Sequence, residues 1–235
     1  MNAVTTRRWT DDQGTAWFAA DVVGGTYEHV AERVLMDYER AGQEWRRGYP
    51  GDTPHLERAW ENFSACIERV LRQAARLEPV PWRAALRELC QRTTGRPVSW
   101  WLAGSTALAV RGAAIEPGDL DIVCDAGDAV TIGELFSDSL IEPVTAGPAD
   151  WLGQWQGRAF WEARIEWVGG INPLVDDPEP CDFGPEAARR LEPVRFEDWQ
   201  ILVPPLDLQR VVNERRGLTH RVAMIDTLAG WSSAC

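Results

Sequence analysis

Two aspartates separated by a single residue are the most chemically informative feature of the sequence. Asp119 and Asp121 open a stretch in which polar and apolar residues alternate, as in a half-buried strand. Side chains at positions i and i+2 of a strand point to the same face, so we expect the two carboxylates to lie together. Two adjacent carboxylates repel each other unless a positive charge lies between them. The pair therefore predicts a site for a divalent cation such as Mg²⁺, which prefers oxygen ligands.

A glycine–serine turn comes shortly before these aspartates. Gly104 and Ser105 follow an apolar strand that ends at Leu102, and residues 106–110 are apolar and suit a short helix. Glycine lets the backbone approach a ligand closely, and the N–H groups that open a helix can bind phosphate. A turn that binds phosphate beside a carboxylate pair that binds a metal is suited to phosphoryl or nucleotidyl transfer.

The segment 101–125 resembles the nucleotidyltransferase superfamily with the DNA polymerase β-like fold. That family has a strand, Gly-Ser, a short helix, Asp-x-Asp on the next strand, and a third carboxylate on a later strand. The spacing is most similar to the small-molecule branch, which includes the aminoglycoside nucleotidyltransferases. The resemblance implies an α/β (α+β) fold with a mixed sheet flanked by helices. It also implies nucleotide contacts from Gly104, Ser105 and Arg111, and one or two Mg²⁺ ions on the carboxylates.

The third carboxylate is expected on a strand within residues 156–171. Glu162, Arg164 and Glu166 alternate there with apolar residues and so share one face. Glu166 lies near the strand end at Gly169, and we expect it to share the metal and to accept a proton. Glu162 is the alternative, farther back on the same face, and a simple cross-strand charge ladder is another interpretation. The family more often has aspartate here, so a glutamate departs from its pattern.

The remaining periodicity predicts three regions along the chain. Residues 1–95 are expected to form a mainly helical region, residues 96–185 the catalytic core, and residues 186–235 a strand and helices beside the cleft. In the first region, apolar residues at helical spacing predict amphipathic helices at about 27–47, 53–77 and 82–93.

All basic residues of the chain are arginines. The 24 basic residues include no lysine, which excludes any mechanism that requires a lysine, including that of a P-loop. It also argues against the toxin-type nucleotidyltransferases, which resemble this chain but typically carry a lysine for phosphate contact. Four arginines lie in or beside the predicted C-terminal helices: Arg210, Arg215, Arg216 and Arg221. They form a solvated basic face, or one or two of them bind nucleotide phosphates.

The composition of the chain indicates which binding partners and which cellular compartment to expect. The net charge of −12 argues against a nucleic-acid partner and favours a small acceptor that is neutral or cationic. The five cysteines and three histidines have no metal-ligand spacing and no disulfide pattern. We expect a cytoplasmic protein, because no apolar stretch could span a membrane and the first residues show no secretory signal. Abundant arginine and alanine without lysine indicate a GC-rich bacterial source.

These observations predict a Mg²⁺-dependent nucleotidyltransferase. It would move a nucleoside monophosphate from a nucleoside triphosphate to a hydroxyl of a small molecule such as an aminoglycoside, and release pyrophosphate. We expect the transferred group to be AMP. An enzyme of that kind would confer antibiotic resistance. Two alternatives stay open: a toxin-like enzyme that acts on tRNA or protein, and a non-catalytic nucleotide-binding module.

Overall fold

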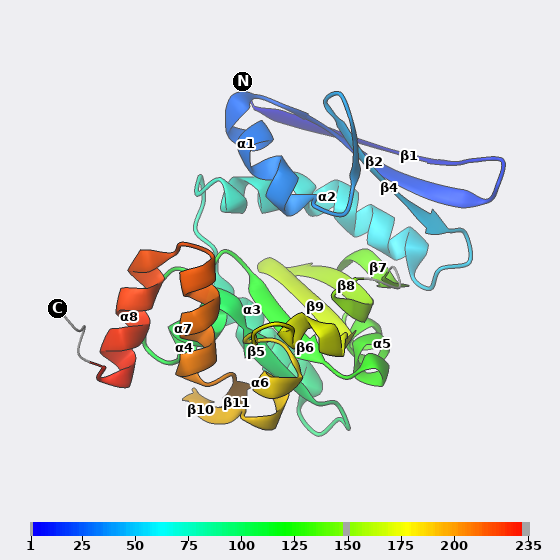
Figure 1. The fold of residues 1–235 in the computed structure, drawn as a ribbon. Helices are drawn as coiled ribbons and strands as arrows, with labels where there is room; N and C mark the ends of the chain where they lie inside the picture. Colours follow the sequence, from blue (N-terminus) through cyan, green and yellow to red (C-terminus); the bar gives the residue numbers. More distant parts are fainter. Residues whose placement is uncertain (1, 148–150, 232–235) are drawn as a thin grey trace.

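The structure, a computed structural model, describes residues 2–147 and 151–231 (Figure 1). The strands are β1 (Ala3–Thr10), β2 (Thr15–Val23), β3 (Glu39–Ala41), β4 (Glu44–Pro50), β5 (Trp100–Ala103), β6 (Leu120–Cys124), β7 (Leu140–Ala146), β8 (Gly153–Trp161), β9 (Ala163–Ile171), β10 (Glu192–Phe196) and β11 (Trp199–Val203). The helices are α1 (Gly25–Val34), α2 (Leu56–Ala74), α3 (Trp82–Thr93), α4 (Gly104–Val110), α5 (Ala126–Leu135), α6 (Pro185–Arg189), α7 (Leu206–Arg215), α8 (Thr219–Ala229) and the 3₁₀ helix η1 (Pro173–Asp176).

The N-terminal part is an antiparallel sheet in the order β1-β2-β4-β3, backed by α1 and α2 (Figure 1). The strand β1 was not predicted, although the turn that follows it has a clear local signal. The Asp11 carboxylate accepts hydrogen bonds from the backbone N–H groups of Gln13 at 2.9 Å and Thr15 at 3.0 Å, and Gly14 has a φ of +79°. Aspartate and glycine at such positions favour a tight reversal of the chain, which pairs β1 with β2.

The prediction of one helix over residues 27–47 is wrong beyond Val34. The helix α1 ends there, and the chain continues as the β3–β4 hairpin, with Gly42 at φ +69° in its turn. Tyr38 and Trp45, whose helical spacing contributed to that prediction, are buried in the same core. The apolar residues of this segment recur at helical spacing because they are buried, not because the segment is a helix. Pairing of β4 with β2 decides its structure instead. The N-terminal region thus combines a four-stranded sheet with the helices α1, α2 and α3.

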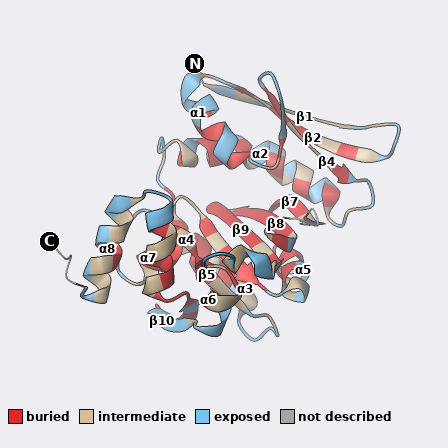
Figure 2. Ribbon diagram, in the orientation of Figure 1, coloured by how far each residue is buried: buried red, intermediate tan, exposed pale blue. Residues whose placement is uncertain are grey.

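The second sheet is mixed, as predicted, and has the order β5-β6-β9-β8-β7. Only the β6–β9 pair is parallel within it; the other neighbours are antiparallel. Trp167 on β9 is 1% exposed and donates a hydrogen bond from its indole N–H to the Ala129 carbonyl of α5 at 3.0 Å. Helices thus cover one face of this sheet, and Figure 2 shows β8 and β9 as buried strands. Glu166, next in sequence to Trp167, points to the opposite face.

The long helix α2 lies between the two sheets and contacts strands of both (Figure 1). Phe63 of α2 packs against Phe18 of β2 with ring centroids 5.9 Å apart, and Asn62 donates to the Leu140 carbonyl of β7 at 2.9 Å. Beyond the second sheet, the segment predicted to contain one strand forms the β10–β11 hairpin, and α7 packs on α8. Within the described residues, no helix combines the length and apolar character needed to cross a bilayer.

Candidate active site

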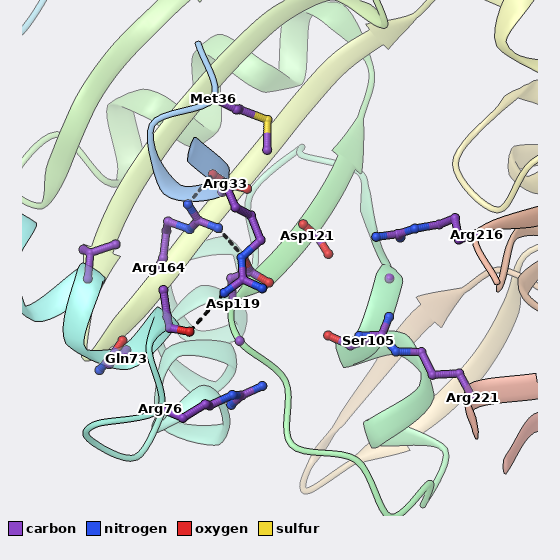
Figure 3. A pocket seen from close by; sticks show the side chains of 15 residues that line it. Arg33, Met36, Gln73, Arg76, Ser105, Asp119, Asp121, Arg164, Arg216 and Arg221 are labelled. Carbon is purple, nitrogen blue, oxygen red and sulfur yellow. Dashed lines mark hydrogen bonds and ion pairs between the residues drawn. The ribbon is translucent and has the colours of Figure 1, made fainter. Parts of the chain in front are cut away.

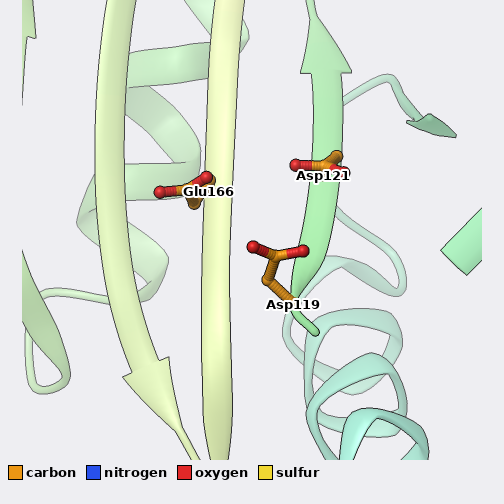
Figure 4. A group of neighbouring side chains, drawn as sticks. All are labelled: Asp119, Asp121 and Glu166. Carbon is orange, nitrogen blue, oxygen red and sulfur yellow. The ribbon is translucent and has the colours of Figure 1, made fainter. Parts of the chain in front are cut away.

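Three carboxylates meet on the open face of the second sheet (Figure 4). Asp121 lies on β6, Asp119 lies directly before that strand, and Glu166 on β9 pairs with Asp121 in the parallel register. One carboxylate oxygen of each residue lies within 4.8 Å of the others. We call these residues the carboxylate trio. Their donor set consists of oxygen atoms alone, which fits a hard divalent cation such as Mg²⁺.

The alternative third carboxylate, Glu162, lies away from the trio. It occupies the turn between β8 and β9 with a φ of +59°, and its carboxylate pairs with Arg69 at 2.8 Å. The expectation that Glu162 shares a face with Glu166 fails because the strand begins only at Ala163, after the turn. Arg164, by contrast, does share that face and points at the trio (Figure 3).

The glycine–serine turn lies directly against Asp121. Gly104 has a φ of +59°, and a Cβ added to it would lie 2.3 Å from Asp121 Oδ2. Only glycine therefore fits both the backbone conformation and the space at this position. Thr106 donates from its hydroxyl to the Asp119 carbonyl at 2.6 Å, which fixes α4 to the aspartate strand. Ser105 follows Gly104 and lines the same pocket as the trio.

This pocket encloses about 270 Å³ and is unusually rich in arginine. The arginines come from distant parts of the chain and point inward from several sides of the trio (Figure 3). Those that line it are Arg33 on α1, Arg76 after α2, Arg164 on β9, Arg216 after α7, and Arg221 on α8. A cavity that joins clustered carboxylates to clustered guanidiniums can bind an anion together with a metal ion.

Some arginines named from the sequence do not reach this pocket. Arg111 pairs with Glu192 and donates to the Pro204 carbonyl at 3.1 Å, so it ties α4 to the β10–β11 hairpin, and we do not retain it as a nucleotide contact. Arg210 pairs with Asp226 at 2.7 Å, and Arg215 donates to the Pro180 carbonyl at 2.8 Å. The pocket-lining arginines of the C-terminal region are therefore Arg216 and Arg221. Arg33 and Arg76 were not predicted, because nothing in their local sequence links them to the aspartates.

Two carboxylates of the trio, Asp121 and Glu166, have opposite electrostatic surroundings. Burial, followed by the charges of Asp119 and Glu166, raises the pKa of Asp121 well above its usual range. Burial also disfavours ionisation of Glu166, but Arg164 and Arg158 outweigh it and lower the pKa of that carboxyl. A raised pKa at Asp121 is the expected result of like charges that are crowded without a counterion, and a divalent cation would reverse it.

A second compartment of about 340 Å³ adjoins the first at Asp121 and Glu166. Its lining is mostly apolar and includes Trp151, Leu152, Val168, Ile171, Phe183 and Val212. Asp182 also lines it, is 4% exposed, and has its pKa raised to about 6 by burial. Asp182 was not predicted as a site residue, because its position between Cys181 and Phe183 in a Pro- and Asp-rich segment gives no local signal for a site.

No family model and no curated protein matches the chain. Among solved structures, it is similar to a protein from Thermotoga maritima that is provisionally described as a nucleotidyltransferase, with 24% identity and a TM-score of 0.48. That match covers 63% of this chain and 89% of the other. The chain is also similar to ANT(2″)-Ia in complex with adenylyl-2″-tobramycin, with 11% identity and a TM-score of 0.41, over 62% of this chain and 87% of the other. At this level of similarity neither protein's activity transfers to this chain, whose function has to follow from its own site.

Proposed function

We propose that the protein is a Mg²⁺-dependent nucleotidyltransferase that moves a nucleoside monophosphate from a nucleoside triphosphate to a hydroxyl group and releases pyrophosphate. The observation that carries this proposal is the junction of the carboxylate trio with the arginine-lined pocket. Carboxylates alone would fit any hard cation, and arginines alone would fit any anion. A polyphosphate bound to a metal ion uses both groups at once.

In this proposal Asp119 and Asp121 would hold Mg²⁺, and Glu166 is the third carboxylate of the cluster. Mg²⁺, when bound, would neutralise charge that develops on the phosphoryl oxygens during transfer. Arg216 and Arg221 would bind the leaving phosphates from the side of α7 and α8 (Figure 3).

Arg221 has a buried hydrogen-bond donor, its Nε, that lacks an acceptor among the described residues. Burial, and then the neighbouring Arg216, lower the pKa of its guanidinium. A phosphate oxygen would supply both an acceptor for Nε and a negative charge between the two arginines, which supports triphosphate binding on this side of the trio.

The apolar compartment is the proposed acceptor side. An attacking hydroxyl must approach the α-phosphorus from the side opposite the leaving pyrophosphate, and the two compartments meet at Asp121 and Glu166. Three carboxylates line this compartment together with two arginines, Arg158 and Arg216, so only one negative charge is left unbalanced. A polycation such as an aminoglycoside would find little net negative charge there. The lining instead favours a hydroxylated acceptor with an apolar face, beside Asp182.

The proposal is tested by measuring pyrophosphate release with each of the four common nucleoside triphosphates, with Mg²⁺ or with EDTA. The acceptor panel contains tobramycin, simple polyols and hydroxylated aromatic compounds. We expect release that requires Mg²⁺, and a loss of about a hundredfold or more in Asp121→Asn. Asp125→Asn is the matched control, because Asp125 is exposed and lies just beyond the same strand.

Equal pyrophosphate release by wild type and Asp121→Asn would contradict the proposal. Nucleotide binding without release for any acceptor would favour a non-catalytic binding module. A preference for tobramycin over every apolar acceptor would restore the aminoglycoside interpretation and contradict our assignment of the apolar compartment.

A further inference from the structure

Arg164 contacts two of the three carboxylates of the trio, Asp119 and Glu166. We infer that its guanidinium takes the place of a second metal ion, so that the site binds one Mg²⁺ instead of two. This inference rests on the proposed function and chooses between the one-ion and two-ion forms of the site.

The guanidinium of Arg164 spans two of the three carboxylates. Its Nη2 lies 2.5 Å from Asp119 Oδ2, and its Nη1 lies 3.3 Å from Glu166 Oε1. The dashed line in Figure 3 marks the contact with Asp119. In two-metal sites the ions are about 3.5–4 Å apart and share carboxylate ligands. A second ion that bridges Asp119 and Glu166 would therefore have to displace this guanidinium.

Arg164 is fixed at this position by the fold. It lies two residues before Glu166 on β9, so both side chains must point to the same face. Its side chain is buried, with the residue only 6% exposed, and Nη1 also donates to the Val34 carbonyl at the end of α1 at 3.2 Å. Withdrawal of the guanidinium would leave a buried charge and a buried carbonyl without partners, which is unfavourable.

A second arginine, Arg158, contacts the same oxygen of Glu166 as Arg164 does. Arg158 donates from Nε to Glu166 Oε1 at 2.5 Å, and it is itself held by Asp37 at 2.6 Å and by Glu142 at 2.8 Å. Glu166 thus faces two guanidiniums. Asp121, in contrast, forms no salt bridge within the described residues.

The charges of the cluster need only one divalent ion. Arg158 is shared with Asp37 and Glu142, which Arg47 also contacts, so the trio and these partners together hold five carboxylates and three guanidiniums. Two negative charges therefore remain uncompensated, and Asp121 is the carboxylate without a salt-bridge partner among the described residues. One carboxylate oxygen of Asp119 lies within 4.8 Å of an oxygen of Asp121, so the two residues could act on one ion. In this arrangement Glu166 is a positioning residue that orients Arg164, and it is not required as a metal ligand.

The test is a titration with Mn²⁺ alone, in which electron paramagnetic resonance reports the free ion and hence the number bound per chain. We expect one Mn²⁺ per wild-type chain and none for Asp121→Asn. Glu166→Gln should still bind one ion with a dissociation constant within about threefold of wild type. Arg164→Met should bind a second ion, or bind the first about tenfold more tightly, because a neighbouring positive charge has been removed.

Arg76→Met is the matched control. Arg76 lines the same pocket, but its guanidinium donates to the carbonyls of Glu116 and Pro117 and not to the trio, so this variant should still bind one ion. If Arg164→Met does not fold, as judged by its melting curve, wild type and Glu166→Gln decide the question by themselves.

Two ions on the wild-type chain would overturn the inference and leave the proposed function intact. Loss of the ion in Glu166→Gln to the same extent as in Asp121→Asn would also overturn it, since Glu166 would then be a ligand. Absence of any bound ion on wild type at millimolar Mn²⁺ would overturn both the inference and the proposed function.

Discussion

Asp119 and Asp121 differ in their surroundings although one residue separates them. Asp119 pairs with Arg164 at 2.5 Å, whereas Asp121 lies against the Gly104 turn without a cationic partner among the described residues. Asp119, Asp121 and Ser105 line the same pocket, so the effects of the three side chains on turnover can be compared within one site. The carboxylates would act on the metal, and the serine hydroxyl would contribute a single hydrogen bond.

We therefore expect Asp119→Asn and Asp121→Asn to lower turnover by about a hundredfold or more, and Ser105→Ala by about tenfold. The reason is that electrostatic stabilisation by the metal dominates phosphoryl transfer. Steady-state pyrophosphate release by the three variants measures this ranking. Equal losses in all three would show that the carboxylates have no special role.

Asp182 predicts a pH dependence of stability. Burial raises its pKa from 3.8 to about 6, even though Arg216 and Arg215 face it and lower the pKa; the like charge of Asp121 is also close by. The unfolded chain thus loses this proton near pH 4 and the folded chain near pH 6. Below about pH 4 the carboxyl is protonated in both states, and its burial costs no ionisation energy. As the pH rises from about 4 to about 6, the free energy of unfolding falls by at most about 3 kcal/mol, because the buried carboxyl ionises less readily than the exposed one.

Asp182→Asn should remove this loss, because the amide stays neutral. We expect the variant to melt at a higher temperature than wild type at pH 8 and to differ little from it at pH 4. Melting curves between pH 4 and pH 8 check this expectation. A constant difference between the two proteins across that range would show that Asp182 does not titrate as described.

At the level of elements, local signals predicted the strand–turn–helix–strand unit that carries Gly104 and the aspartates. A turn glycine, an apolar helix and a strand with alternating polarity each leave a pattern within a few residues of sequence. The β3–β4 hairpin was missed because its pairing with β2 depends on a strand more than twenty residues away in the sequence. Apolar residues at helical spacing in that segment then favoured the wrong element.

Gly104→Ala tests the turn. The new Cβ would meet Asp121 Oδ2 at 2.3 Å in a backbone conformation that disfavours side chains, so Asp121 would have to move. We expect unfolding free energy to fall by about 1–3 kcal/mol and Mg²⁺-dependent nucleotide binding to weaken. Gly112→Ala is the control, because Gly112 has a φ of +95° with no atom within 4 Å of the added Cβ.

Gly112→Ala should lose stability through backbone strain but keep nucleotide binding. Urea unfolding and a nucleotide titration on both variants separate the two effects. Binding that weakens equally in both would show that the contact between Gly104 and Asp121 does not matter.

At the scale of the whole molecule, the site is assembled from the second sheet and from residues in and just after α1 of the N-terminal part. The N-terminal part contributes Arg33, the Val34 carbonyl that binds Arg164, and Asp37, which pairs with Arg158. The contact between Asp37 and Arg158 joins residues that are 121 positions apart, so no local pattern could have predicted it. This explains why the aspartates were recognised from sequence and the arginines that surround them largely were not.

Asp37→Ala should therefore affect both stability and function. Asp37 pairs with Arg158 at 2.6 Å and with Arg47 at 3.5 Å, and its side chain is 21% exposed. Its loss should lower the unfolding free energy by about 1–2 kcal/mol and reduce turnover, because Arg158 then holds Glu166 less firmly. Asp52→Ala, at an exposed position, is the control and should change neither urea unfolding nor pyrophosphate release. Identical behaviour of the two variants would contradict a role for the N-terminal part in the site.

The most direct test of the central claim is a thermal shift with ATP, CTP, GTP and UTP, each with Mg²⁺ and with EDTA, on wild type and Asp121→Asn. We predict that at least one nucleotide stabilises wild type only when Mg²⁺ is present, by about 2.7 kcal/mol at about a hundredfold excess over its dissociation constant. The shift should vanish in Asp121→Asn. Stabilisation that is equal in EDTA, or unchanged in Asp121→Asn, would contradict a metal-dependent nucleotide site at the carboxylate trio.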